Sequence, residues 1–300
     1  MDIRNRKTVI LIWVFNLVVG LLVLPLLINP QSIVAWWIFV AKGLLLVGIA
    51  ILAAATIHWA TGSILLGLSW RALRRADYDQ ALRLMHRMKA LSEHEFHGAI
   101  LSLAGRPKEA GEIFGKLALT ARDPIGRARR LTLLAEVLMD QERWAQAKET
   151  LEEAIRLDLG LGNRCNPLAA WYLLQGIEPQ QALDLIEQAN TALGFAGLKS
   201  SVRNGILPVR FATKALALAR LGRHHEAELA IVEAFRKADT RFVPRMALLH
   251  WYAGMAFTAM GQPARASDHF QNAAAIDAQG KYGKLAVHWL EDGNRNSTTP

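Results

Sequence analysis

Cysteine is nearly absent from the chain: Cys165 is the one thiol among 300 residues. No disulfide can form within the chain, and a lone thiol makes neither a zinc motif nor a redox pair. Runs of β-branched residues are also scarce beyond Arg71, where charged and apolar positions recur at helical spacing among many Ala and Leu residues. The sequence therefore predicts an all-α fold, and its single thiol fits a reducing compartment.

Dense basic runs are missing too, except in short segments beside the apolar N-terminal region. The formal net charge is +9, which by itself could suggest nucleic-acid binding. However, Lys and Arg are interleaved with Asp and Glu on most of the predicted helices, whereas nucleic acid is bound by a contiguous basic surface. We expect no nucleic-acid partner.

The long apolar runs lie near the N-terminus. Residues 8–28 carry no charge, and a helix of this length can cross a hydrocarbon core. A signal peptide is the competing interpretation, but the run is too long and no small-x-small cleavage site follows. A second run, residues 36–59, has Trp near both ends, and Lys42 within it either snorkels outward or belongs to an ion pathway. We predict a transmembrane hairpin over residues 1–62.

The orientation follows from the basic residues that flank the two runs. The loop at residues 29–32 has no charge, whereas three basic residues precede the first run and three follow the second: Arg4, Arg6, Lys7, Arg71, Arg74 and Arg75. By the positive-inside rule, both termini face the cytoplasm. The expected location is the inner (plasma) membrane, as a multi-pass protein with the lipid bilayer as one of its partners.

Over residues 63–292 a helix–turn–helix unit recurs. In the clearest unit, the small residue Ala135 is followed at the spacing of the repeat by Ala147 and Ala154, with Leu151 between them and Trp144 just before the second helix. Similar offsets recur in five more units, listed in chain order: Tyr78, Ala81 and Met85; Gly98, Gly105, Ala110 and Phe114; Ala170, Ala182, Ile186 and Ala189; Ala215, Gly222, Ala227, Ile231 and Ala234; Gly254, Gly261, Ala266, Phe270 and Ala273. The spacing predicts about six stacked helical hairpins.

These offsets resemble the tetratricopeptide repeat (TPR) superfamily over about two thirds of the chain. The resemblance implies an α-solenoid in which the first helix of each unit lines a concave groove. Two apolar runs followed by TPR helices are also similar in layout to HemY-type inner-membrane proteins. No residue motif carries over the association of that group with haem biosynthesis.

Two segments depart from the repeat. Residues 192–207, with Gly194, Gly197, Gly205 and the following Pro208, predict a long connection between units. Residues 281–291 predict a helix that caps the last unit, and residues 293–300 predict a disordered tail.

Candidate chemistry is sparse. His94 and His97 flank Glu95, but zincin motifs place their two histidines four residues apart, and here the spacing is three. A metal site therefore competes with a packing role. Gly160 and Gly162 follow no strand and precede no Lys-Ser/Thr pair, so they predict no phosphate loop. Since no nucleophile setting is present either, we expect no catalytic residue, metal or cofactor, and no enzyme.

The groove is the candidate site. The resemblance implies that its lining positions are Arg129, Thr132, Glu136, Met139, Asp140, Trp171, Leu174, Gln175, Trp251, Met255 and Thr258. Trp and Arg are enriched in binding hot spots, although Trp171 and Trp251 could instead fill the core between repeats. The Lys and Asn residues of the family's peptide-carboxylate clamp are absent, so a chaperone tail is not the expected ligand.

The favoured hypothesis is a membrane-anchored interaction scaffold or adaptor that recruits a protein or peptide partner through the concave groove. The alternative is a regulatory or assembly subunit whose hairpin contacts a membrane transporter or enzyme through Gly20, Pro25 and Lys42. Exchange of the hairpin for an unrelated one would separate the two hypotheses, because a mere anchor is replaceable.

Overall fold

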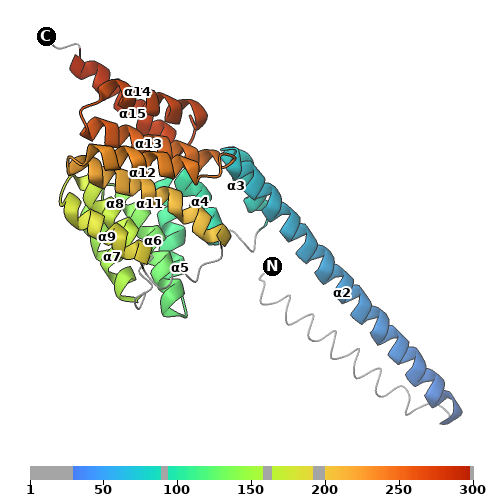
Figure 1. The fold of residues 1–300 in the computed structure, drawn as a ribbon. Coiled ribbons are helices and arrows are strands. Elements are labelled where there is room, and N and C mark those ends of the chain that lie inside the picture. Colours follow the sequence, from blue (N-terminus) through green and yellow to red (C-terminus); the bar gives the residue numbers. More distant parts are fainter. Residues whose placement is uncertain (1–29, 89–93, 158–163, 192–199, 298–300) are drawn as a thin grey trace. The chain divides into compact units, whose positions relative to one another are not determined.

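The computed structural model describes residues 30–88, 94–157, 164–191 and 200–297. Helices account for nearly all of these residues, and none of them lies in a strand (Figure 1). The helices are α2 (Pro30–Arg74), α3 (Tyr78–Arg87), α4 (Glu95–Leu103), α5 (Pro107–Leu119), α6 (Pro124–Asp140), α7 (Trp144–Leu157), α8 (Cys165–Gln175), α9 (Pro179–Thr191), α11 (Ser200–Arg220), α12 (His224–Arg236), α13 (Val243–Ala259), α14 (Pro263–Ile276) and α15 (Lys281–Ser297). The all-α prediction is confirmed.

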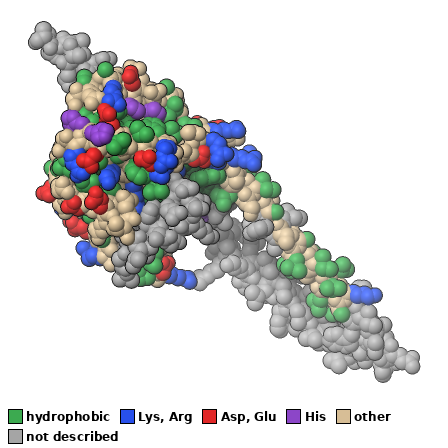
Figure 2. All heavy atoms as spheres, viewed as in Figure 1, with side chains coloured by type: hydrophobic (Ala, Val, Ile, Leu, Met, Phe, Trp, Pro, Cys, Tyr) green, Lys and Arg blue, Asp and Glu red, His purple; other side chains and the backbone are tan. Residues whose placement is uncertain are grey.

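The chain forms two compact units, Met1–Ile64 and Leu65–Pro300. Helix α2 supplies residues to both. In the second unit, successive helices pair as hairpins, among them α4 with α5, α6 with α7, α8 with α9, α11 with α12 and α13 with α14. Side chains of both charge signs are interspersed over the face of these helices that Figure 2 shows.

Small residues let the two helices of a hairpin approach each other. A Cβ atom added to Gly98 of α4 would lie 2.7 Å from the Phe114 ring of α5, and one added to Gly254 of α13 would lie 2.7 Å from the Phe270 ring of α14. Both distances are shorter than van der Waals contact, so only glycine fits. The spacing of small and large residues that predicted the hairpins therefore corresponds to direct packing between them.

Five hairpins share one turn. The residue two positions before the second helix has a positive φ in each of them: Ala76, Gly105, Glu142, Gly222 and Gly261. The next backbone N–H donates to a carbonyl five residues earlier, as Arg143 does to Leu138 at 2.9 Å. This is the Schellman termination, which glycine favours because a Cβ is strained in the left-handed region. Glu142 occupies such a position at a cost of about 1 kcal/mol.

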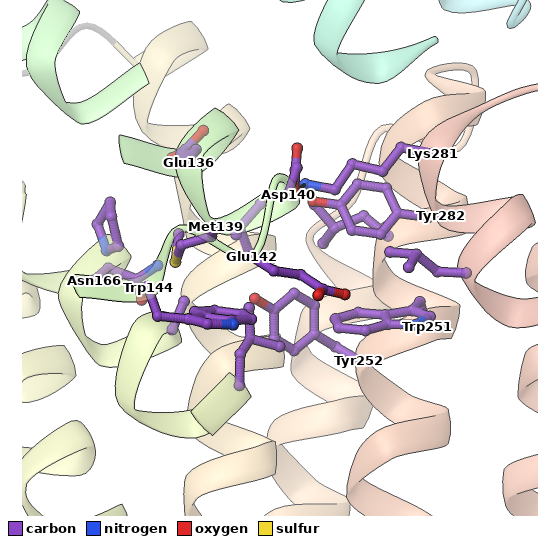
Figure 3. Close-up of a pocket in the computed structure, with 16 residues that line it drawn as sticks. Glu136, Met139, Asp140, Glu142, Trp144, Asn166, Trp251, Tyr252, Lys281 and Tyr282 are labelled. Atoms are coloured by element: carbon purple, nitrogen blue, oxygen red, sulfur yellow. Dashed lines mark ion pairs between the residues drawn. The ribbon is translucent and has the colours of Figure 1, made fainter. Parts of the chain in front are cut away.

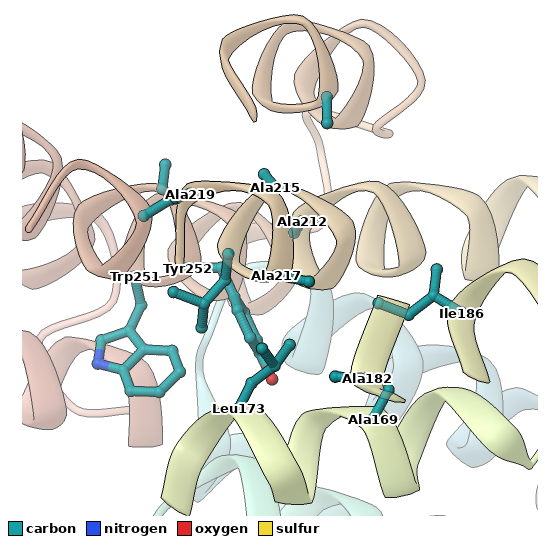
Figure 4. Close-up of a cluster of buried hydrophobic side chains, with 14 of the residues drawn as sticks. Ala169, Leu173, Ala182, Ile186, Ala212, Ala215, Ala217, Ala219, Trp251 and Tyr252 are labelled. Carbon is teal, nitrogen blue, oxygen red and sulfur yellow. The ribbon is translucent and has the colours of Figure 1, made fainter. Parts of the chain in front are cut away.

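Alanine-rich faces form the centre of the core. Figure 4 shows Ala212, Ala215, Ala217 and Ala219 of α11 near the larger side chains of neighbouring helices, including Leu173. Each of these residues is nearly or completely buried. Small side chains on α11 thus leave room for bulky ones on α8 and α13.

The long connection expected at residues 192–207 is shorter in the structure. Helix α11 begins at Ser200 and continues through Gly205 and Pro208. Residues 192–199 lie outside the described part of the chain. Proline removes one N–H donor from a helix and disfavours its interior, but the buried Arg210 and Thr213, just beyond Pro208, show that tertiary packing holds this segment helical.

The predicted membrane location is wrong on the evidence of the described residues. Among residues 30–88, 94–157, 164–191 and 200–297, no helix is both long and apolar enough to cross a bilayer. The second predicted span lies in α2, whose sequence there includes Lys42, Thr56 and His58. The first span, residues 8–28, lies outside the described residues.

The row of hairpins closes on itself. Helix α15 begins at Lys281, as expected of the capping helix, and packs on α13 and α14, with the Trp289 and Phe270 rings stacked 4.1 Å apart. It also contacts α4, where Lys284 Nζ donates to the Ala104 carbonyl at 3.2 Å. Tyr78 of α3 donates to the carboxylate of Asp277. The first and last repeats are therefore joined.

Candidate functional site

The closed arrangement encloses a partly open cavity of about 390 Å³, which we call the groove cavity. Helices α6, α8, α11, α13 and α15 contribute to its wall, together with the α6–α7 turn. Its charged residues are Glu136, Asp140, Glu142 and Lys281, and its aromatic residues are Trp144, Trp251, Tyr252 and Tyr282 (Figure 3). A volume of this size lies within the range of ligand pockets, about 300 to 1,000 Å³.

Helix α6 places two carboxylates on one face of the wall. Glu136 and Asp140 are four residues apart, one helical turn, so their side chains project in the same direction. Asp123 fixes the start of this helix by accepting a hydrogen bond from the Gly126 N–H at 2.6 Å. The carboxylates thus stand on a capped helix, not on a loop.

Lys281 forms an ion pair with Oδ1 of Asp140 across the cavity wall, from the first turn of α15. The two side chains are 18% and 15% exposed, so water screens their interaction only partly. The second carboxylate oxygen of Asp140, Oδ2, is buried and has no hydrogen-bond partner among the described residues. Burial raises the pKa of Asp140, and the ammonium of Lys281 opposes that rise.

Glu136 is the more strongly perturbed carboxyl. Burial raises its pKa to about 7, with Lys281 lowering it and Asp140 raising it further. No described residue forms a hydrogen bond or a close ion pair with its carboxylate, yet the residue keeps some exposed area. A side chain that lines a cavity is surrounded by protein and still has some exposed area, and Glu136 shows both features. Near pH 7, therefore, Glu136 can take up or lose a proton with little change in free energy.

Aromatic rings also line the cavity. Trp251 meets the neighbouring Tyr252 ring edge to face at 5.0 Å, and its ring centroid lies 5.8 Å from that of Tyr282. Burial raises the pKa of both tyrosine hydroxyls, so they are neutral at physiological pH. The ammonium of Lys281 lies 5.0 Å from the centre of the Tyr282 ring, within the range of a cation–π contact.

Glu142 enters the cavity from the turn after α6. Its φ of 58° belongs to the left-handed region, where three equivalent turns carry glycine. Figure 3 shows its side chain reaching toward the rings of Trp251 and Tyr252. The residue is exposed, and its carboxylate has no hydrogen-bond or ion-pair partner among the described residues. An exposed carboxylate at a strained position has no evident role in the fold.

The structure divides the predicted groove residues into two groups. Five of them line the cavity: Glu136, Met139, Asp140, Leu174 and Trp251. The other six lie elsewhere: Arg129 pairs with Glu95 at 2.8 Å, Thr132 is buried and donates to the Ala128 carbonyl, Trp171 is buried and donates to the Trp144 carbonyl, Met255 packs on the core, and Gln175 and Thr258 are exposed. Trp171 is therefore a core residue, which was the alternative considered for it.

Several cavity residues were missed by the sequence analysis: Glu142, Trp144, Tyr252, Lys281 and Tyr282. Only Glu142 carried a usable signal, since it stands where the repeat pattern has glycine in most units. Lys281 and Tyr282 enter through the return of α15 toward α6, and repeat spacing contains no information on that contact.

The histidine cluster of α4 has other roles. His94 caps the helix, with Nδ1 accepting from the Phe96 N–H at 3.2 Å, and Glu95 pairs with Arg129 and Arg130. Among the residues for which the structure gives positions, no group of three or more His, Cys, Asp or Glu could hold a metal ion. The proposed metal use of His94 and His97 thus gains no support from their surroundings.

A second histidine pair lies between α13 and α14. The Nδ1 atoms of His250 and His269 are 3.0 Å apart, so one must donate and the other accept. The His269 ring stacks on Phe257 at 5.3 Å, and the His250 ring meets Phe235 at 4.8 Å. Burial, with a smaller contribution from His269, lowers the pKa of His250 to about 4, and burial also lowers the pKa of His269.

This pair makes folding stability depend on pH. A histidine with a lowered pKa in the folded state binds fewer protons than the unfolded chain, so its contribution is complete above pH 6.5 and declines as the pH falls toward 4. We expect wild type to lose about 1 to 2 kcal/mol relative to a His250→Phe variant between pH 7 and pH 5, after allowance for partial solvent screening. Urea unfolding at both pH values measures this difference.

The His225→Gln variant is the control for that measurement, because His225 is an exposed residue of α12. It should track wild type at both pH values. Glu136 titrates in the same pH range in the opposite direction, but its contribution is common to wild type and both variants and cancels. Parallel pH profiles for wild type and His250→Phe would refute a neutral buried pair.

No protein-family model and no curated protein sequence matches the chain. Similar solved structures include MamA, at 19% identity over 58% of this chain and 91% of that one, with a TM-score of 0.34. They also include the nearly identical TPR-like repeats of a Podosopora anserina kinesin light chain, at 20% identity over 63% of this chain and 96% of that one, with a TM-score of 0.39. Both TM-scores are below 0.5, and the helical-hairpin architecture stands on the packing contacts described above.

Proposed function

We propose that this chain is an interaction scaffold that binds a segment of a partner protein at the groove cavity, without catalysing a reaction. The observation that carries the proposal is the cavity itself, which lies on the first helices of the hairpins and combines aromatic rings with charged groups that the fold leaves unpaired. Aromatic residues on a rigid framework bind with a small loss of conformational entropy.

Rigidity comes from the closing contacts. Because α15 is tied to α6 by Lys281 and to α4 by Lys284, the walls of the cavity are held in place before a ligand arrives. Preorganised sites lose less free energy to ordering on binding. A segment of a partner could therefore bind with useful affinity although the cavity is small.

Partner capture from cell extract tests the proposal. We expect a Glu136→Gln, Glu142→Gln variant to lose at least about 90% of the partner that wild type retains, since the two substitutions remove the unpaired carboxylates with little change of shape. Quantitative affinity purification of the full chain measures the loss.

The matched control is a Glu112→Gln, Glu149→Gln variant. It makes the same two Glu→Gln replacements, but at two exposed positions on the second helices α5 and α7, away from the cavity. It should retain the partner. If both variants lose the same partner, general charge and not the cavity governs the association. If neither does, the partner binds elsewhere on the surface.

A further inference from the structure

We infer that the groove cavity receives an organic cation, the guanidinium group of an arginine side chain in the bound segment, between the carboxylates of Glu136 and Glu142 and the rings of Trp251 and Tyr252. This inference rests on the proposed function and specifies what the partner segment must present. The inference follows from the carboxylates of the cavity, from its aromatic rings and from the contacts of Lys281.

The charge of the wall selects a cation. Three carboxylates line the cavity, and Lys281 is the one basic residue among the lining residues that the structure describes. Lys281 is committed to Asp140 Oδ1, which leaves Asp140 Oδ2, Glu136 and Glu142 without partners. An anion would be repelled, and an apolar group would leave carboxylates buried and unpaired, which costs more than a lost hydrogen bond.

The rings favour a delocalised cation. Tyrosine and tryptophan faces attract cations, and guanidinium groups stack on them while still donating hydrogen bonds in their own plane. With five N–H donors, a guanidinium can bind one carboxylate through two parallel hydrogen bonds and still reach another. The combination of Trp251, Tyr252 and two free carboxylates therefore suits arginine better than a compact ammonium group.

Lys281 shows how the cavity accommodates a cation. Its ammonium group sits on an Asp140 oxygen and 5.0 Å from the centre of the Tyr282 ring, so carboxylate and ring act on it together. Glu142 with Trp251 and Tyr252 repeats this pairing of carboxylate and rings on the other side, without an internal cation. The guanidinium group of the bound segment therefore binds beside Glu142, where the cavity has no cation of its own.

Glu142 supports the inference because a glutamate at this left-handed position destabilises the turn. Glycine would fit this left-handed position without strain, as it does at Gly105, Gly222 and Gly261. A Glu142→Gly variant should therefore raise the melting temperature by about 2 to 4 °C, while lowering affinity for the cation. A residue that served the fold alone would not combine these two effects.

Binding should also strengthen as the pH rises. Glu136 is faced by Asp140 on its own helix, by Lys281 and Tyr282 on α15, and by Tyr252 on α13, and of these groups only Lys281 favours its ionised form. A bound guanidinium adds a second cation, so binding should release a proton from Glu136. Affinity should rise several-fold between pH 6 and pH 8.

The test is calorimetry of the full chain with three probes: a capped peptide with a central arginine, the same peptide with neutral citrulline in its place, and spermidine. We expect the arginine peptide to bind at least tenfold more tightly than the citrulline peptide. Glu136→Gln and Glu142→Gly should each lower the affinity for arginine about tenfold. Ala76→Gly relieves the same strain in a turn remote from the cavity and should raise the melting temperature without changing affinity.

Equal affinity for the arginine and citrulline peptides would overturn the inference, and so would unchanged binding in both carboxylate variants. Spermidine binding more tightly than the arginine peptide would overturn the peptide source of the cation. The proposed scaffold function fails separately: if arginine is preferred but extract proteins bind equally to wild type and the Glu136→Gln, Glu142→Gln variant, the cation site stands without the scaffold role. If capture is lost but arginine is not preferred, the reverse holds.

Discussion

Replacing Lys281 with methionine should lower the free energy of unfolding by about 3 kcal/mol. The substitution keeps an unbranched side chain one atom shorter than lysine, but it leaves the carboxylate of Asp140, which is 15% exposed, without its cation. One oxygen of that carboxylate already lacks a hydrogen-bond partner. Removing one member of a buried pair strands the other charge, and this costs more than the pair itself contributes. Urea unfolding of the full chain at pH 8 measures the change.

A double variant decides whether the loss comes from the stranded charge. In Asp140→Leu, Lys281→Met no carboxylate remains to be desolvated, and apolar replacements of buried ion pairs are often neutral or stabilising. We expect it to recover most of the lost stability. If the double variant were as unstable as Lys281→Met alone, the contribution of Lys281 would lie in packing against Tyr282, not in its charge. Recovery would locate the effect in the ion pair.

The same contact marks the limit of what repeat spacing can predict. The positions Ala135, Ala147 and Ala154 predicted a hairpin because only small side chains allow two helices to approach, and all three are fully buried in the structure. That argument is local: both helices of a unit lie within a few turns of sequence. The pairing of Asp140 with Lys281 joins residues far apart in the chain, and no periodic pattern encodes it.

Local sequence preferences also led to a different prediction from the structure at two places. Gly205 and Pro208 indicated a connection, yet packing of the residues that follow holds them in α11. The apolar run at residues 36–59 indicated a membrane span, whereas no described helix meets the requirements for one. In α11, tertiary packing outweighed the local preferences of glycine and proline.

The predicted groove positions differ in where their side chains lie, and their use in binding stays a prediction. The family resemblance placed Glu136 and Asp140 among the groove positions, and both line the cavity. Trp171 was placed in the groove by register, but its ring is buried and its Nε1 donates to the Trp144 carbonyl at 2.9 Å. A shift of one position on a helix turns a side chain by about 100°, enough to move it from groove to core.

The second large effect is expected at a glycine. Replacing Gly254 with leucine should lower the free energy of unfolding by about 3 kcal/mol, because even a Cβ atom there would lie 2.7 Å from two atoms of the Phe270 ring. That ring cannot easily move away, since it is fully buried and stacks on Trp289 of α15 at 4.1 Å. Overpacking at this point should separate α13 from α14 and loosen the capping helix. Thermal unfolding followed by circular dichroism measures the loss.

Gly115 supplies the matched control for that substitution. It also lies within a helix, α5, but nothing comes within 4 Å of an added Cβ. Gly115→Leu should therefore stabilise the chain by about 0.5 to 1 kcal/mol, the gain in helix propensity over glycine. Opposite signs for the same substitution would show that Gly254 is required by the close approach of the helices. Stabilisation at both positions would mean that Phe270 has room to move, and that the hairpin tolerates a larger separation than its packing implies.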